Sequence, residues 1–184
     1  MIPRVRLISR EYVIAQRTLH ASPRGYGGKG DAWAEAVCEL MRHYQATSVL
    51  DYGCGQGALV KALRLKDIKG ARFAEYDPAI PGKDSPPVFA DLVVCTDVLE
   101  HIEPDRLDAV LAHLKLLARR AVFAVIALRP ANKTLIDGRN AHLIIETAEW
   151  WTGRLESAGF TVLAGPKKPG KLARELSVVL AVGA

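Results

Sequence analysis

The spacing of apolar residues changes repeatedly between the strand period and the helix period along most of this sequence. It predicts strands at 48–51, 72–76, 91–96 and 121–128, with helices at 58–65 and 104–118 between them. Strands that alternate with helices are typical of a layered α/β domain with a mostly parallel sheet. With 184 residues, the chain has the length of a single domain.

The two ends of the chain extend this pattern. A weak helix at 11–19 and a stronger helix opened by Asp31 as its N-cap predict an N-terminal helical extension over residues 1–45. The α/β core then covers residues 46–184, and both parts belong to one domain.

After the core helices, Thr147 is the expected N-cap of a last helix, which stops at Gly159. The strands that follow, at 160–163 and 176–182, are separated by a polar turn. Their closeness predicts an antiparallel pair at the end of the sheet.

Composition excludes several classes of protein. Apolar residues make up 49% and charged residues 24% of the chain, which is a globular balance. No apolar run reaches the roughly 18 residues of a membrane span, and the N-terminus has no secretion signal, so we expect a cytoplasmic protein without membrane contact. Three cysteines without close pairing indicate neither disulfides nor zinc. The net charge of +5 is modest for a nucleic-acid-binding protein.

A glycine-rich segment, Asp51-Tyr52-Gly53-Cys54-Gly55-Gln56-Gly57, follows the first strand of the core and directly precedes a helical stripe. Glycines there permit a tight turn and close approach of a ligand to the backbone, and the helix start offers unpaired N–H groups. Dinucleotide sites have the order G-x-G-x-x-G, whereas here the third glycine comes one residue early. Asp51 would repel a pyrophosphate and suits a cationic amino-acid group.

Three segments in order, 50–57, 73–78 and 91–102, resemble the class I (Rossmann-like) S-adenosylmethionine-dependent methyltransferases. The resemblance is to the branch with a D-V-L-E-H segment after the fourth strand, and it covers roughly residues 45–184. It implies a three-layer sandwich with a seven-stranded type of sheet whose last strand is antiparallel. It also implies S-adenosylmethionine as the cofactor and S-adenosylhomocysteine as the product.

The resemblance assigns the cofactor site residue by residue. The expected cofactor-binding residues are Asp51, Tyr52, Gly53, Cys54, Gly55, Gly57, Glu75, Tyr76, Asp77, Asp97, Val98 and Leu99. One acid at the end of the second strand should accept hydrogen bonds from both ribose hydroxyls. Asp77 is favoured because Asp-Pro matches the family pattern, and Glu75 is the alternative.

The sequence departs from the family between Asp77 and the strand at 91–96. Thirteen residues with four prolines separate them, which is too short for a helix and a full third strand. The third strand is therefore expected to be short or missing, with 87–89 as its candidate. Asp84 and Ser85 are candidates for contacts with the adenine, and backbone atoms of this segment are the preferred alternative.

The D-V-L-E-H segment at 97–101 supplies the candidate catalytic residues, Glu100 and His101, which His142 joins from the loop predicted at 129–145. His101 can act as a general base near neutral pH, or it can order the following loop. Asp97, Glu100, His101 and His142 also resemble a magnesium or manganese set of RNA 3′-end 2′-O-methyltransferases. The same histidine occurs in metal-free relatives, so no metal is expected.

Several features near this segment leave alternatives open. Arg139 can bind an acidic substrate group or pair with Asp137. Trp151 is expected in the core, whereas Trp150 is either surface packing or a wall of the acceptor site. Gly25–Gly30 with Tyr26 is either a lid over the cofactor or a linker.

The function expected from the sequence is methyl transfer from S-adenosylmethionine to an oxygen or nitrogen atom, with a small molecule as acceptor. A D/N/S-P-P-Y/F stretch and a Pro-Cys nucleophile are both missing, which disfavours DNA bases. The alternatives are an RNA-modifying 2′-O-type methyltransferase, with or without metal assistance, and a non-catalytic module that binds the same cofactor.

Overall fold

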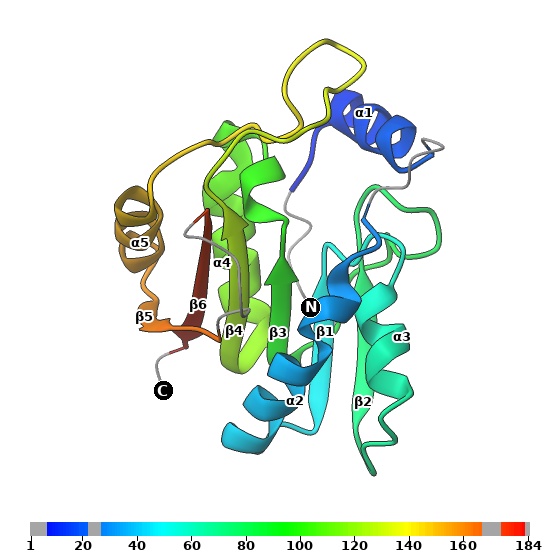
Figure 1. Cartoon of the computed structure of the whole chain (residues 1–184), viewed down its shortest axis with the longest axis vertical. Helices are drawn as coiled ribbons and strands as arrows, with labels where there is room; N and C mark the ends of the chain where they lie inside the picture. Colours follow the sequence, from blue (N-terminus) through cyan, green and yellow to red (C-terminus); the bar gives the residue numbers. More distant parts are fainter. Residues whose placement is uncertain (1–6, 22–26, 167–173, 183–184) are drawn as a thin grey trace.

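The computed structural model describes residues 7–21, 27–166 and 174–182 (Figure 1). Its strands are β1 (Ser48–Tyr52), β2 (Arg72–Tyr76), β3 (Ala90–Thr96), β4 (Ala118–Ala127), β5 (Thr161–Ala164) and β6 (Glu175–Ala181). In the described part of the chain they form a six-stranded sheet in the order β2-β1-β3-β4-β6-β5. The first four strands are parallel, and β6 is antiparallel to both β4 and β5. The predicted mostly parallel α/β fold is confirmed.

Helices cover both faces of this sheet and make it the middle of three layers. One face carries α4 (Leu107–Leu117) and α5 (Ala148–Ser157). The other carries the 3-10 turn η1 (Gly30–Trp33), α2 (Ala34–His43) and α3 (Ala58–Arg64). Within the described ranges, no helix has the length and apolar character needed to cross a membrane.

Strand β3 shows how the sequence builds the two apolar layers. Val93 and Cys95 face the α4 side, while Leu92 and Val94 face the α2 and α3 side. All four side chains are fully buried. Successive side chains of a strand point to opposite faces, so a strand covered on both sides is apolar throughout.

The third strand is missing, which is one of the two outcomes that the short connection predicted; its candidate at 87–89 is not a strand. Those residues form no strand, and the chain runs from β2 to β3 through a turn that contains Gly82. Pro86 and Pro87 have no amide hydrogen to donate to the edge of β2. Within the described residues, β2 is therefore the outer strand on this side of the sheet.

Two helix boundaries also differ from the sequence prediction. Asp31 caps nothing with its side chain, because it lies inside η1, whose N-cap position is Lys29. Gly30 starts this turn against α3, where a Cβ on it would approach Leu59 to 3.2 Å. The helix predicted at 104–118 begins instead as the 3-10 turn η3 (Pro104–Arg106), and β4 already starts at Ala118.

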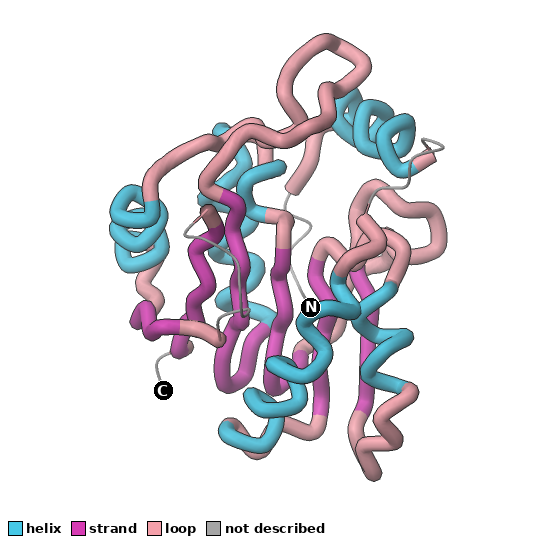
Figure 2. Tube along the Cα trace, viewed as in Figure 1, coloured by secondary structure: helices cyan, strands magenta, loops and turns pink. Residues whose placement is uncertain are grey.

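A helix and a long loop lie over the carboxyl ends of the parallel strands. The helix is α1 (Arg10–His20), and the loop, residues 128–147, arches across the top of the sheet from β4 to α5 (Figure 2). Tyr12, Ala15 and Leu19 of α1 pack with Leu135 and Ala141 of the loop. The two segments therefore form one roof above the sheet edge.

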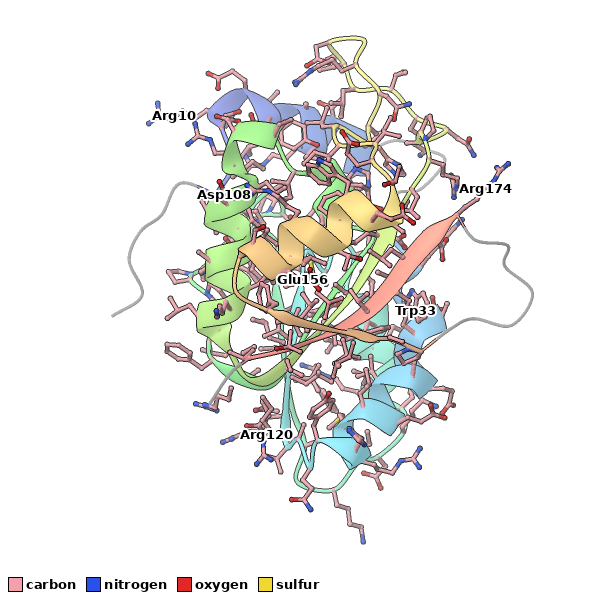
Figure 3. The ribbon with its side chains drawn as sticks, turned by 90° about the vertical axis from the view of Figure 1, so that its left-hand side faces the viewer. Arg10, Trp33, Asp108, Arg120, Glu156 and Arg174 are labelled. Atoms are coloured by element: carbon pink, nitrogen blue, oxygen red, sulfur yellow. The ribbon has the colours of Figure 1, made fainter. Side chains whose placement is uncertain are left out.

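The cap predicted for α5 is confirmed. The Thr147 side chain accepts a hydrogen bond from Trp150 N at 3.2 Å. Trp151 is fully buried, as expected, and Trp150 is partly exposed. An ion pair between Arg154 and Asp108 joins α5 to α4, and Figure 3 shows these two helices side by side.

The Thr147 cap gives a first prediction. Thr147→Ala removes the hydroxyl that caps this helix, so the free energy of unfolding should fall by about 1 kcal/mol. Thr147→Ser keeps the hydroxyl oxygen and should retain most of the stability. Urea unfolding followed by circular dichroism measures both variants, and equal losses in the two would contradict the capping role.

Candidate active site

The glycine-rich turn between β1 and α3 is bonded to the end of β2. Gly53 N and Cys54 N both donate to Tyr76 O, at 2.8 and 3.1 Å. Gly53 and Gly55 have φ angles of 75° and 50°, which favour glycine. A Cβ on Gly55 would also lie 2.7 Å from Gly27 O. Both the conformation and the close approach of the backbone therefore require glycine in this turn.

A cavity of about 580 Å³ opens beside this turn, beneath the roof. Ten of the residues expected from the sequence line it: Asp51, Tyr52, Gly53, Cys54, Gly55, Asp77, Asp97, Val98, His101 and His142. Five others are not part of its lining: Gly57, Glu75, Tyr76, Leu99 and Glu100. The roles assigned to all of them remain predictions. The size is that of an ordinary small-molecule site.

The two competing acids at the end of β2 have different surroundings. Asp77 accepts hydrogen bonds from Gly55 N at Oδ2 and from Ala79 N at Oδ1, at 3.0 and 2.9 Å. Glu75 pairs with Lys83, with 3.2 Å between its Oε1 and the lysine Nζ. A carboxylate has about four acceptor positions, so Asp77 can bind further donors in the cavity, whereas Glu75 is held away from it.

Asp51 is a buried carboxyl group at the start of the glycine turn. Its side chain is 5% exposed. Burial, reinforced by the charge of the neighbouring Glu75, raises the pKa of Asp51 to about 7. A cation in the cavity would stabilise the ionised form and lower this pKa again.

The Asp97–His101 segment bends sharply against the glycine turn. Asp97 has a φ of 55°, a rare conformation for a residue with a side chain. Its amide donates to Val125 O at 2.9 Å. The next side chain, Val98, occupies the space that a Cβ on Gly53 would need. The structure therefore brings Asp97 and Val98 to the turn, on the cavity wall.

His101 and His142 lie together on the other side of the cavity. His101 belongs to the 3-10 turn η2 (Leu99–His101), and His142 to the long loop. Their rings meet edge to face, with 4.6 Å between centroids. Burial, together with His142, lowers the pKa of His101 to about 3, and burial also lowers the pKa of His142. Both rings are neutral at physiological pH, and a base this weak removes few protons.

Glu100 holds the long loop in place from within the protein. Its backbone oxygen accepts hydrogen bonds from Leu143 N and Ile144 N, at 2.8 and 3.0 Å. Its side-chain Oε1 accepts from Ala127 N at 3.0 Å. The side chain is fully buried. Burial, with a smaller contribution from Asp97, raises the pKa of Glu100 to about 8.

The sequence did not indicate the part that α1 has in this site. Tyr12, Gln16 and His20 of this helix line the cavity. The Tyr12 hydroxyl donates to His101 O at 2.5 Å, and Arg17 Nε donates to Ala79 O at 3.0 Å. In the sequence, the helical spacing of Tyr12, Gln16 and Leu19 indicates that this face of the helix is buried. It does not indicate which residues the face packs against. Of the proposed lid, Gly27, Gly28 and Gly30 line the cavity, while Gly25 and Tyr26 lie outside the described residues.

Asp137 and Arg139 of the long loop form an ion pair with each other. Arg139 donates to Asp137 through Nε and Nη2, at 2.9 and 2.7 Å. Neither residue lines the cavity. The alternative in which the two pair with each other is therefore the one that the structure shows.

Solved structures with similar folds include several methyltransferases. The 1,6-didemethyltoxoflavin-N1-methyltransferase of Burkholderia thailandensis, with its substrate and S-adenosylhomocysteine bound, has a TM-score of 0.68 at 18% identity. That match covers 100% of this chain and 93% of the other. The magnesium protoporphyrin IX methyltransferase of Synechocystis, with S-adenosylhomocysteine bound, has a TM-score of 0.59 at 17% identity and covers 95% of each chain.

Human N-acetylserotonin methyltransferase, in complex with S-adenosylmethionine, has a TM-score of 0.56 at 16% identity; the match covers 95% of this chain and 55% of the other. No curated protein matches the sequence significantly. A family model described as a methyltransferase domain matches residues 9–164. Because this match spans most of the sequence, the chain belongs to the methyltransferase domain family.

Proposed function

We propose that the protein is an S-adenosylmethionine-dependent methyltransferase that acts on an oxygen or nitrogen atom of a small molecule. One observation carries this proposal: a single cavity joins the glycine turn, flanked by Asp51 and Asp77, to a second half lined by His101 and His142. The bound substrate of the Burkholderia thailandensis enzyme supports a small acceptor. The volume of the cavity allows one such molecule beside the cofactor.

The residues at the turn suit each part of the cofactor. The turn lacks side chains at Gly53 and Gly55, so a ligand can approach the backbone closely. Asp51 would attract the ammonium group of the methionine part. Asp77 would accept hydrogen bonds from the ribose hydroxyls. Ala79, next to it on the cavity wall, belongs to the segment whose backbone would meet the adenine.

The second half of the cavity orients the acceptor. When bound, the cofactor supplies a methyl group on a positively charged sulfur, which is a good leaving group. His101 and His142, which line this half, would position a polar O–H or N–H group of the acceptor so that its lone pair points at the transferred methyl group. Alignment of two reactants by itself contributes strongly to rate, so the chemistry does not require a strong base.

The assignment of the ribose to Asp77 is tested by paired variants. Asp77→Ala removes a charged acceptor worth about 1.5–3 kcal/mol, so affinity for S-adenosylhomocysteine should fall at least about tenfold. Gly55→Val, which meets Gly27 O, should abolish binding. Glu75→Gln is the matched control and should leave the affinity unchanged when all variants are measured at a pH well above the pKa of Asp51, where this carboxyl is ionised with or without the charge of Glu75. Isothermal titration calorimetry measures all three, with thermal unfolding as a check of the fold.

Two outcomes would contradict this assignment. If Glu75→Gln weakens binding and Asp77→Ala does not, the ribose is held by the other acid. If Gly55→Val and Asp77→Ala both bind like the original protein, the cofactor site is elsewhere.

The raised pKa of Asp51 predicts a pH dependence of binding. Below pH 7 this carboxyl is protonated in the free protein, and ammonium binding has to displace the proton. Affinity for S-adenosylhomocysteine should therefore rise with pH up to about 7, by at most about tenfold per pH unit, and then level off. Asp51→Asn should bind more weakly and lose this slope. If the affinity of Asp51→Asn still rises with pH in the same way, the pH dependence comes from another titratable group.

Turnover separates the proposal from its alternatives. We expect S-adenosylhomocysteine to form from S-adenosylmethionine with members of a library of phenols, alcohols and nitrogen heterocycles, and not with RNA oligonucleotides. Product formation only with RNA, and binding that falls steeply with salt, would favour the RNA-modifying alternative. Tight cofactor binding without turnover on any acceptor would favour the non-catalytic module.

A further inference from the structure

Glu100, His101 and His142 bring metal-ligating atoms together at the far wall of the cavity. One ligand atom from each of the three lies within 4.8 Å of the others. Glu100 and His101 are neighbours in the turn η2, and His142 comes from the long loop that the backbone oxygen of Glu100 holds. Two imidazoles and one carboxylate are a ligand set that binds transition metals with positions left open.

Hydrogen bonds fix the orientation and the tautomer of both rings. His101 Nδ1 lies 2.7 Å from Ala141 O, and His142 Nδ1 lies 2.6 Å from Arg129 O. A carbonyl oxygen can only accept, so each Nδ1 carries the ring proton and each Nε2 carries the lone pair. Metal-ligating histidines typically donate their second ring nitrogen to a backbone carbonyl in this way.

The Glu100 side chain has an oxygen that the protein itself leaves unsatisfied. Oε1 accepts from Ala127 N, but Oε2 is buried without a hydrogen-bond partner. A buried polar atom without a partner costs about 1–3 kcal/mol, and a cation bound to Oε2 would offset that cost. A purely structural role for Glu100 would need only Oε1 and the backbone oxygen, which hold β4 and the long loop. Such a role does not explain why a second carboxyl oxygen is buried there.

We propose that Glu100, His101 and His142 bind one first-row transition-metal dication, such as Zn²⁺ or Co²⁺, through Oε2 and the two Nε2 atoms. From the sequence no metal is expected, and the alternative considered there was magnesium or manganese with Asp97 as a fourth ligand. The converging group does not include Asp97. Two nitrogen ligands favour transition metals over Mg²⁺ and Ca²⁺, which prefer oxygen.

The position of this site suggests what the ion contacts. His101 and His142 line the cavity, and Glu100 lies behind them. The open coordination positions therefore face the half of the cavity where the acceptor would bind. An oxygen of the acceptor can occupy one of them, next to the transferred methyl group; this role of the ion rests on the proposed function, whereas the binding of the ion does not.

Cobalt provides a direct test, because Co²⁺ bound to nitrogen and oxygen ligands absorbs visible light. Chelator-treated protein titrated with Co²⁺ should develop this absorption with one equivalent. Zn²⁺ should abolish it, and a large excess of Mg²⁺ should not. His142→Ala and Glu100→Gln should each weaken Co²⁺ binding at least about tenfold. Glu100→Gln keeps the shape and the Oε1 acceptor, so the fold should be preserved.

His43→Ala is the matched control, since His43 lies exposed on α2 and should not contribute. Absence of the absorption at one equivalent, or its retention in both His142→Ala and Glu100→Gln, would overturn the proposal. So would its loss in His43→Ala. Calorimetry with S-adenosylhomocysteine on the same samples keeps the two proposals apart: Co²⁺ binding without nucleoside binding overturns the proposed function alone, and the reverse result overturns the metal site alone.

Discussion

The bonds between the glycine turn and the end of β2 determine where the rest of the site lies. Two amides of the turn share the carbonyl of Tyr76, and a third donates to Asp77. Each such bond contributes only about 0.5–1.5 kcal/mol, but together they hold the tips of two parallel strands at a fixed distance. Without side chains at Gly53 and Gly55, the resulting gap stays open as a cavity. The neighbouring segments, including Val98, are packed against this arrangement.

Buried charges and polar groups collect at this same edge of the sheet. The middle of β3 is apolar on both faces, whereas Asp51, Asp77, Glu100 and His101 are all buried near the carboxyl ends of the parallel strands. Burial pushes the pKa values of the acids Asp51 and Glu100 up and that of His101 down. Such opposed shifts are costly for stability and are concentrated at functional sites. The apolar helices on both faces compensate for this cost.

The sequence predicted the parts of the fold that depend on local spacing. The core strands, the cap at Thr147 and the glycine turn were all visible in the residue pattern. The Asp-Pro pattern favoured Asp77 over Glu75, but the contact that distinguishes the two acids was not visible: Lys83, from a later turn, pairs with Glu75. The contacts of α1 with η2 join segments far apart in the sequence, so no local pattern predicts them. The shortness of the connection before β3 and its prolines, Pro86 and Pro87 among them, were also visible in the sequence, and the third strand is missing as this allowed.

The placement of α1 mechanically links the two parts of the cavity. One short helix reaches both ends of the cavity, through Arg17 to Ala79 on one side and through Tyr12 to His101 on the other. A shift of this one helix would therefore alter the cover over both parts of the cavity at once, because neither hydrogen bond can be broken by moving α1 without affecting the other.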